Sequence, residues 1–310
     1  MMEDTPNYKA GYVALAGRPN VGKSTLVNTL LGQKIAAVSS KPQTTRRRQL
    51  GILTLPQAQI IFVDCPGIHL QHHKLGESLN QTAEEVISDV DIIAWMVDGS
   101  AEPSGDDLQA RDMVIQARRR KKLLVVNKMD RVPEENQPAA VERYHSLLPD
   151  AHPVVISAET GEGLEVLTAA IIELLPEHPT YFNDDEITDL YEREIASDLI
   201  REAALKHLRE EVPHALAVRI DEFKERDDGK TYVAATLFVE RESQKGIVIG
   251  QKAEMLKRIG TSARMEMEKM GDRSIFLELR VKVAKGWRDD PDFLNRLGFQ
   301  ITQKANRKKR

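Results

Sequence analysis

The sequence has one cysteine, no long apolar run and no excess of positive charge. Because Cys65 is the only cysteine in the 310 residues, no disulfide can form within the chain, which is typical of proteins in the reducing cytoplasm. The acidic N-terminus lacks the apolar segment of a secretory signal, and no apolar run is long enough to cross a bilayer. The formal net charge is −4, so any contact with nucleic acid must come from a local basic patch.

Short apolar runs alternate with helical patterns in the first part of the chain, as far as Pro176. The strand-like runs cover residues 12–16, 60–63, 91–97, 123–126 and 153–156, and the helical stretches cover residues 23–31, 75–88, 106–120, 138–148 and 164–175. This alternation predicts an α/β fold, with a mostly parallel sheet and helices on both faces. Residues 49–55 and 59–63 are typical of a hairpin, which would add one antiparallel strand at the sheet edge.

The composition changes after residue 175, where a polar connector contains Pro176 and Pro179. We therefore predict a first domain over residues 1–178, a linker over 179–188 and a second domain over 189–310. The second domain reads as a helix over 189–210, strands over 216–223 and 231–240, a helix over 253–269 and a strand over 274–283. That order is typical of an α+β domain, and it ends in a basic tail at residues 306–310.

A phosphate-binding motif follows the first expected strand and opens the first expected helix. The string Gly17-Arg18-Pro19-Asn20-Val21-Gly22-Lys23-Ser24 fits G-x-x-x-x-G-K-[ST] over its full length and is followed by Thr25. Its glycines let backbone N–H groups and the helix N-terminus surround phosphate oxygens. We expect Gly17, Asn20, Val21, Gly22, Lys23, Ser24 and Thr25 to bind the nucleotide, with the Ser24 hydroxyl on Mg²⁺. A glycine turn that merely caps a helix is the alternative.

Asp64-Cys65-Pro66-Gly67 lies at the end of the expected strand 60–63. Asp64 is placed to hold Mg²⁺ through water, and the Gly67 N–H to contact the γ-phosphate. The polar loop over residues 39–48 is expected to act as an order–disorder switch in which one of the adjacent threonines, Thr45 in preference to Thr44, completes the Mg²⁺ shell. An exposed basic loop of no particular role is the alternative, and Arg46-Arg47-Arg48 is either solvated or a partner contact. Lys23, Thr45 and Gly67 form the predicted catalytic set, and Cys65 is expected to be a buried, unreactive thiol.

Asn127-Lys128-Met129-Asp130 follows the expected strand 123–126 and predicts guanine recognition. The Asp130 carboxylate can accept from guanine N1–H and the exocyclic amino group, whereas adenine offers neither donor. The Lys128 stem can cover one face of the base, and Asn127 can brace the loop. After the strand 153–156 comes Ser157-Ala158, whose Ala158 N–H is placed to donate to guanine O6.

The usual water-orienting glutamine is missing after this D-x-x-G segment, where the sequence has Ile68 and His69. Ile68 cannot orient water; His69 could, and a solvated or partner-facing histidine is the alternative. Slow intrinsic GTP turnover is therefore expected, accelerated by a partner or by a monovalent cation such as K⁺ that Asn20 helps to ligate.

A candidate RNA clamp lies in the second domain. KH domains hold a nucleotide backbone with a G-x-x-G loop, and here Gly250-Gln251-Lys252-Ala253 follows the β-branched run Val248-Ile249. The predicted RNA-binding residues are Ile249, Gly250, Gln251, Lys252, Ala253, Lys257 and Arg258. Ala253 replaces the last glycine and limits backbone freedom. A helix start with solvated lysines is the alternative.

Taken together, these motifs resemble the Era family of bacterial GTPases. The resemblance rests on the nucleotide motifs and, in the second half, on Glu210-Glu211-Val212-Pro213-His214, Val239-Glu240-Arg241-Glu242-Ser243-Gln244-Lys245, Ile249-Gly250 and Trp287-Arg288. It implies a P-loop G domain followed by a type II KH domain. It also implies binding to the 3′ end of 16S rRNA and action in assembly of the 30S subunit.

The same resemblance implies peripheral association with the inner face of the cell membrane. From the residues themselves we expect a cytoplasmic protein and, since nothing in the sequence suggests an obligate oligomer, a monomer. Ala253 departs from the family's G-x-x-G pattern and puts the geometry of that loop in question. Other functional classes compatible with the motifs are an RNA-binding scaffold that uses GTP only for stability, and a GTPase acting on tRNA or at a membrane.

Overall fold

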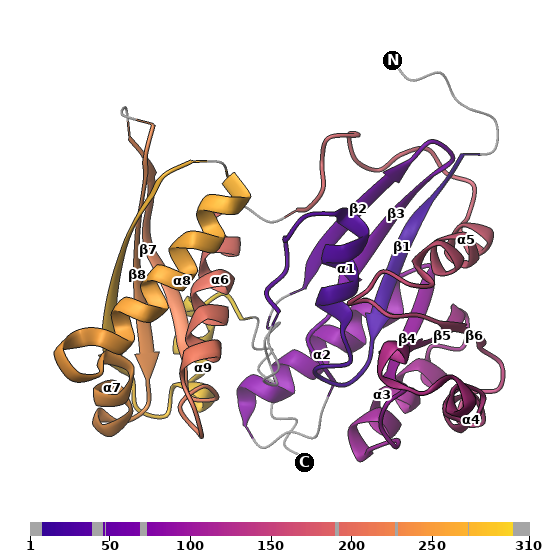
Figure 1. Cartoon of the computed structure of the whole chain (residues 1–310), viewed down its shortest axis with the longest axis horizontal. Coiled ribbons are helices and arrows are strands. Elements are labelled where there is room, and N and C mark those ends of the chain that lie inside the picture. Colours follow the sequence, from indigo (N-terminus) through magenta and orange to yellow (C-terminus); the bar gives the residue numbers. More distant parts are fainter. Residues whose placement is uncertain are drawn as a thin grey trace, which may run out of the picture.

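The chain forms two parts, each built around its own β-sheet (Figure 1). The computed structural model describes residues 8–38, 46, 48–68, 73–189, 192–226, 229–271 and 273–299. Among these residues, no helix combines the length and the apolar character that a membrane crossing needs.

The first part has a six-stranded sheet in the order β2-β3-β1-β4-β5-β6. Its strands are β1 (Lys9–Ala16), β2 (Gln49–Leu55), β3 (Ala58–Asp64), β4 (Ile92–Asp98), β5 (Lys121–Asn127) and β6 (His152–Val155). All neighbouring pairs are parallel except β2 and β3, which form an antiparallel hairpin at the edge. The predicted α/β sheet and its antiparallel edge strand are therefore confirmed.

Helices cover both faces of this sheet. They are α1 (Lys23–Leu31), α2 (Lys74–Asp89), α3 (Gly105–Gln116), α4 (Gln137–His145) and α5 (Leu164–Leu174). Alternate residues of β1 enter two separate cores: Ala14 packs with α2, α3 and α4, whereas Val13 and Leu15 pack with α1 and α5. Strand β4 is buried along its whole length, as expected for a central parallel strand with helices on both sides.

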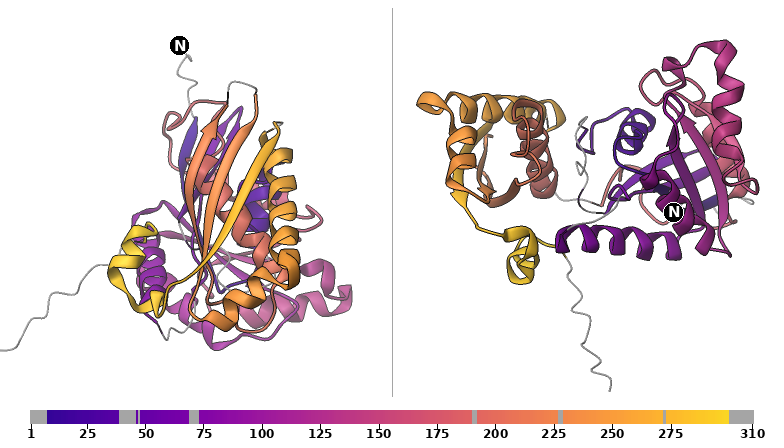
Figure 2. Two further views of the ribbon diagram at one scale, coloured as in Figure 1. Left: turned by 90° about the vertical axis from the view of Figure 1, so that its left-hand side faces the viewer. Right: turned by 90° about the horizontal axis from the view of Figure 1, so that it is seen from below.

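The second part has a three-stranded sheet in the order β7-β8-β9. Its elements are α6 (Glu192–His207), β7 (Ala217–Glu225), β8 (Thr231–Val239), α7 (Glu242–Ile249), α8 (Glu254–Gly271), β9 (Ile275–Val283) and α9 (Pro291–Arg296). Helices α6 and α8 pack side by side on one face of the sheet and share its apolar core (Figure 2). The predicted α+β order is confirmed.

Two helices of this part were not expected from the sequence. The sequence predicts a β-branched run leading into the Gly250 turn, but Val248 and Ile249 lie in α7, so the turn joins two helices. Helix α9 follows the turn containing Trp287 and begins at Pro291. The preceding Asp290 is its N-cap, and the Asp290 side chain accepts two backbone N–H bonds.

The two parts contact each other directly. Leu75 and Leu79 of α2 form an apolar cluster with Phe238, Trp287 and Leu294 of the second part, and α9 lies beside the start of α2 (Figure 2). The connector follows the edge strand β2. The Ile187 carbonyl accepts from the Ile52 N–H at 2.9 Å, and the Asp189 carboxylate accepts from the Leu50 N–H at 2.9 Å. The connector thus covers part of an edge that would otherwise be open for pairing.

Candidate guanine-nucleotide site and nucleic-acid interface

The predicted nucleotide motifs meet at the carboxyl edge of the six-stranded sheet. The phosphate loop follows β1, Asp64 ends β3, Asn127 ends β5 and Ser157 comes shortly after β6. Since these strands are parallel, their carboxyl ends lie along one edge, where open α/β sheets bind ligands.

Close packing explains two glycines of the phosphate loop. A Cβ at Gly22 would lie 2.3 Å from Asn127 Nδ2, and one at Gly17 would lie 2.3 Å from the Met96 carbonyl oxygen. Gly22 also has a φ of 105° and immediately precedes α1, with Ser24 and Thr25 in the first turn of that helix. The loop is therefore shaped as a close-fitting cradle at a helix N-terminus.

Lys23 is buried inside this loop. Its Nζ donates to the carbonyls of Gly17 and Arg18, each at 3.0 Å. Burial lowers the pKa of Lys23, although the nearby Asp64 carboxylate acts in the opposite direction. Ser24 Oγ donates to Asp64 Oδ2 at 2.6 Å, so two oxygen groups predicted to face Mg²⁺ lie together. Oxygen ligands of this kind suit a hard divalent cation.

The D-x-P-G segment packs against the phosphate loop. The Ile68 N–H donates to the Gly17 carbonyl at 3.1 Å, and a Cβ at Gly67 would lie 2.7 Å from the backbone nitrogen of Pro19. Burial, reinforced by the Asp64 carboxylate, raises the pKa of the Cys65 thiol to about 12. The predicted switch residue Thr45 and the candidate His69 lie outside the described residues.

One buried amide joins the phosphate loop to the base-reading loops. Asn127 Nδ2 donates to the Val21 carbonyl at 2.7 Å, and its Oδ1 accepts from the Ala158 N–H at 2.8 Å. The Ala158 N–H, predicted to donate to guanine O6, is thus engaged within the protein here. Asp130 Oδ1 accepts from Ser157 Oγ at 2.7 Å, which orients the carboxylate proposed to read guanine.

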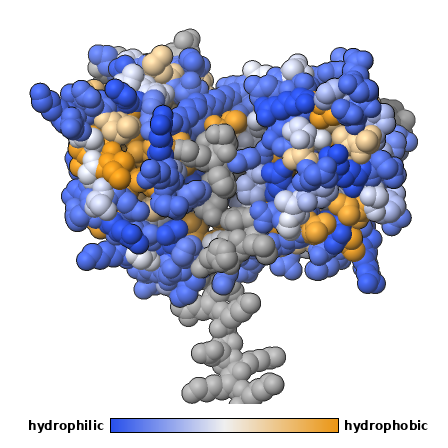
Figure 3. All heavy atoms as spheres, turned by 60° about the horizontal axis from the view of Figure 1, so that its bottom comes forward, coloured by the Kyte–Doolittle hydropathy of each residue, from blue (hydrophilic) through white to orange (hydrophobic). Residues whose placement is uncertain are grey.

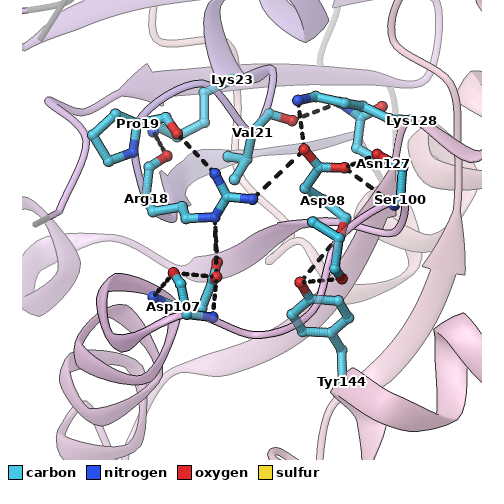
Figure 4. Close-up of polar contacts among 12 residues, drawn as sticks. Arg18, Pro19, Val21, Lys23, Asp98, Ser100, Asp107, Asn127, Lys128 and Tyr144 are labelled. Atoms are coloured by element: carbon cyan, nitrogen blue, oxygen red, sulfur yellow. Dashed lines mark hydrogen bonds and ion pairs between the residues drawn. The ribbon is translucent and has the colours of Figure 1, made fainter. Parts of the chain in front are cut away.

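A chain of alternating charges lies beside this loop, and the sequence did not point to it (Figure 4). Arg18 Nε donates to Asp107 at 3.0 and 3.1 Å, and Arg18 Nη2 lies 3.6 Å from Asp98 Oδ2. Lys128 Nζ donates to the same Asp98 oxygen at 2.6 Å. Burial acts to raise the pKa of Asp98, but hydrogen bonds from Lys128 and Ser100 hold it below its usual range. The position of Asp98 at the carboxyl end of β4 was the signal that could have found it.

In the second part, a pocket runs between α8 and the edge strand β9. Its lining residues are Ala253, Leu256, Lys257, Gly260, Thr261, Arg264 and residues 275–279. Ala253 and Lys257 of the predicted RNA set line this pocket. Gln251, Lys252 and Arg258 are exposed at its α7–α8 end, and Ile249 and Gly250 are half-buried there. Thr261, Arg264 and the β9 edge were not predicted from the sequence as part of this site.

The loop at Gly250 has an unusual backbone. Gly250, Lys252 and Ala253 have φ values of 72°, 47° and 62°, so Ala253 adopts a left-handed conformation that favours glycine.

The surface in Figure 3 is mainly hydrophilic, with an apolar area on the second part. The exposed large apolar side chains of that part are Ile247, Met265 and Phe276.

The segment before the predicted switch loop is tied to the second part. Lys34 Nζ contacts Glu202 of α6 and Glu266 of α8, each at 2.8 Å. The Val38 N–H also donates to Glu202 at 3.1 Å. Glu202 is 2% exposed, so its carboxylate is a buried junction between the two parts.

Arg46, within the predicted switch loop, is also held by the second part. It is 5% exposed, its Nη1 donates to the Leu216 carbonyl at 2.9 Å, and its guanidinium lies 5.5 Å from the Trp287 ring centroid. Burial, together with the nearby cationic Arg201 and Arg288, holds the pKa of Arg46 well below its usual range. Of the two alternatives for this arginine run, Arg46 is thus a contact within the molecule, Arg48 is exposed, and Arg47 lies outside the described residues.

Each of the two parts of the chain matches a known protein family. Residues 12–128 match the family described as 50S ribosome-binding GTPase, and residues 211–288 match the KH domain family. The fold and the site therefore define a P-loop GTPase joined to a KH domain.

Curated relatives match nearly the whole chain. It is 41% identical to GTPase Era of Ruminiclostridium cellulolyticum, over 96% of this chain and 99% of that protein. It is 44% identical to GTPase Era of Geobacter metallireducens, over 96% of this chain and 100% of that protein. The chain belongs to the Era family of GTPases.

Two solved structures of Era are similar over nearly the full length. One is Era in complex with MgGDPNP and nucleotides 1506–1542 of 16S ribosomal RNA, with a TM-score of 0.90, 38% identity, and coverage of 95% of this chain and 100% of that chain. The other is a point variant of Aquifex aeolicus Era bound to GDP and AlF₄⁻, with a TM-score of 0.90, 38% identity, and coverage of 94% and 100%.

Proposed function

We propose that this GTPase binds the 3′ end of 16S rRNA through its KH domain and acts as a GTP-controlled switch in assembly of the 30S subunit. The observation that carries the proposal is the full-length similarity to an Era structure solved with MgGDPNP and nucleotides 1506–1542 of 16S rRNA. The proposed domains are residues 1–178 for the G domain, 179–188 for the linker and 189–310 for the KH domain with its tail.

Guanine selection is assigned to the loops after β5 and β6. Asp130, oriented by Ser157, accepts from guanine N1–H and the exocyclic amino group. The Lys128 stem covers one face of the base, and Asn127 sets the spacing between base and phosphates because it already joins Val21 to Ala158. For Ala158 to donate to guanine O6, its N–H must be shared with, or released from, Asn127.

Phosphate binding is assigned to the loop from Gly17 to Thr25, through its backbone N–H groups and through Lys23, whose Nζ would exchange the Gly17 and Arg18 carbonyls for phosphate oxygens. Ser24 and Asp64, with Thr45 from the switch loop, would hold Mg²⁺. The ion supplies charge neutralisation on the β- and γ-phosphates when bound. The observed Ser24–Asp64 contact supports this fit, since both groups are oxygen donors at one spot.

Hydrolysis is proposed to be slow without an activator. Ile68 is fully buried against the phosphate loop and has no group to orient water. With nucleotide bound, Lys23 and the Gly67 N–H would stabilise the transferred phosphoryl group, and Thr45 would help to hold Mg²⁺. We assign to Asn20 a role in holding a monovalent cation such as K⁺. Turnover that is equal in matched Na⁺ and K⁺ buffers would remove that assignment.

RNA binding is assigned to the α7–α8 loop and the pocket behind it. Lys252, Lys257 and Arg258 supply positive charge at the loop, in a protein whose net charge is −4. Among the residues that the structure describes, no further strand pairs with the outer side of the edge strand β9, so single-stranded bases can be hydrogen-bonded along it.

The switch role is supported by the ties on both sides of residues 39–45. Lys34 and Val38 reach Glu202 on one side, and Arg46 reaches the Leu216 carbonyl on the other. Reordering of this loop around a γ-phosphate would therefore bear directly on the position of the KH domain. We place the protein in the cytoplasm as a monomer, with peripheral contact with the inner face of the cell membrane.

Phosphate release under multiple turnover, with and without an RNA of the 16S 3′ end, tests the proposal. We expect the protein to release phosphate faster than buffer alone. RNA of scrambled sequence should not stimulate this turnover. A doubly substituted variant, Lys257→Gln with Arg258→Gln, should lose RNA binding but keep GTP binding. A protein that binds the RNA and releases no phosphate would instead be a GTP-stabilised scaffold. One that hydrolyses GTP but prefers tRNA or lipid vesicles over this RNA would contradict the assigned target.

A further inference from the structure

The base-reading Lys128 is held in place from outside its own loop. Its backbone has a φ of 64°, in the left-handed region that L side chains rarely adopt. A flexible lysine stem on a strained loop is a poor surface for a base unless something fixes its head. The contact that does so is the ion pair at 2.6 Å between Lys128 Nζ and Asp98 Oδ2.

Asp98 is itself fixed on its other side. Its Oδ1 accepts from the Ser100 hydroxyl at 2.6 Å and from the Ser100 N–H at 3.1 Å, so the carboxylate closes the turn after β4. The Tyr144 hydroxyl lies 3.1 Å from the backbone carbonyl oxygens of both Asp98 and Ala101, which share its one proton, and it anchors the same turn to α4. The side chain of Asp98 is only 9% exposed, so water competes weakly for its oxygens.

The phosphate loop reaches the same carboxylate through Arg18. The Arg18 guanidinium lies between Asp98 and the fully buried Asp107, which also forms the capping box that starts α3 with Ser104. Four charges of alternating sign thus run from α3 through the phosphate loop and the β4 turn to the base-reading loop (Figure 4).

We infer that Asp98 is a positioning residue for nucleotide binding, which fixes the Lys128 stem for contact with the purine face and ties it to the phosphate loop through Arg18. This inference rests on the proposed assignment of Lys128 to the base. Asp98 does not read the guanine edge. Its removal should therefore weaken binding of any purine nucleotide that keeps N1–H, whether or not the exocyclic amino group is present.

The test is a double-mutant cycle on the full-length protein, with dissociation constants for GTP and for ITP, which lacks that amino group. Asp98→Asn keeps the size of the side chain and an oxygen for Ser100 but removes the ion pair. We expect it to weaken GTP and ITP equally, by about tenfold, the size typical of losing one charge-assisted hydrogen bond. In kinetics the loss should appear in KM more than in kcat. Asp91→Asn, at the opposite end of β4, is the matched control and should change neither dissociation constant.

The cycle separates failure of the inference from failure of the nucleotide-site assignment. If Lys128→Met weakens both nucleotides and Asp98→Asn adds nothing in that background, the inference holds. If the two losses multiply, or if Asp98→Asn alone has no effect, it is overturned. If Lys128→Met leaves both affinities unchanged, the assignment of Lys128 to the base fails first, and the inference falls with it.

Arg18→Met provides a second variant that leaves the turn after β4 and the Lys128–Asp98 pair in place. It should cause a smaller loss, about threefold, again equal for GTP and ITP and again absent in the Lys128→Met background. Asp98→Glu should recover part of the affinity that Asp98→Asn loses, because it restores a carboxylate near the Lys128 head. A loss that Asp98→Glu does not reduce would overturn the charge-based explanation.

Discussion

Replacing Ala253 by glycine should stabilise the KH domain. At a φ of 62°, alanine pays about 1–2 kcal/mol relative to an ordinary backbone conformation. Glycine removes that cost, but its greater chain entropy favours the unfolded state by about 0.4–1 kcal/mol. The net expectation for Ala253→Gly is a gain of about 0.5–1 kcal/mol in the free energy of unfolding, whereas alanine-to-glycine changes within helices destabilise.

Each of the two parts carries one of the two tryptophans, so the unfolding of each part can be followed by its own fluorescence signal. Trp287 is buried in the KH part and Trp95 in the G domain. In a Trp95→Phe background, urea unfolding followed by Trp287 fluorescence should show a higher midpoint for Ala253→Gly at an unchanged slope. The control is Ala169→Gly at an exposed position of α5, followed by Trp95 in a Trp287→Phe background. It should lose about 1 kcal/mol.

The sign of the change decides the matter. If Ala253→Gly lowers the midpoint as a helical alanine-to-glycine change does, Ala253 does not hold a left-handed backbone, and the loop is not shaped like a G-x-x-G turn. A bulkier side chain should have the opposite effect on stability. Ala253→Val should destabilise the domain by more than about 1 kcal/mol, because β-branched side chains tolerate this conformation least.

Three further predictions concern the nucleotide site and the domain contact. In competition titrations, Asp130→Asn should turn a preference for GTP into one for XTP, because xanthine has a carbonyl where guanine has its amino group; retained GTP preference would contradict the base assignment. Lys34→Met should reduce the effect of GTP on RNA affinity measured by filter binding, whereas Lys206→Met, which removes a pair within α6, should leave it intact. Hydrogen bonding from Lys34, opposed by burial, holds the pKa of Glu266 below its usual 4.5. The stability that the charged Glu266 adds is therefore present above pH 4.5, and it is lost as the pH falls through the lower pKa that Glu266 has in the folded protein. Accordingly, Glu266→Gln should lower the melting temperature at pH 6 and have little effect near pH 3; an equal effect at both would refute the ion pair.

The nucleotide site could be predicted because its residues are consecutive in sequence and sit at strand ends. The spacing of the glycines in the Gly17–Ser24 loop follows from the backbone conformation of the loop. The segment from Asn127 to Asp130 follows a strand that is apolar on both faces. The helices and strands of the G domain could also be predicted, because buried runs that alternate with amphipathic stretches indicate a sheet covered by helices on both faces.

What the sequence could not show are contacts between distant segments. Arg46 looks like one of three surface arginines, yet its guanidinium is buried against Leu216, which is 170 positions away. Glu202 has no local motif, and its role comes from Lys34 in the other part of the molecule. Helix α7 was missed because Val248 and Ile249 favour a strand locally, whereas packing on the KH core selects a helix.

The single cysteine has a practical consequence for experiments on this protein. Since Cys65 is buried and its pKa is about 12, almost none of it is thiolate at neutral pH, and maleimide or iodoacetamide reagents should pass it by. A cysteine engineered on the surface of each domain could then be labelled with a fluorophore pair while the native thiol stays in place. Distances between the domains could be followed during catalysis without altering the loop that contains Asp64.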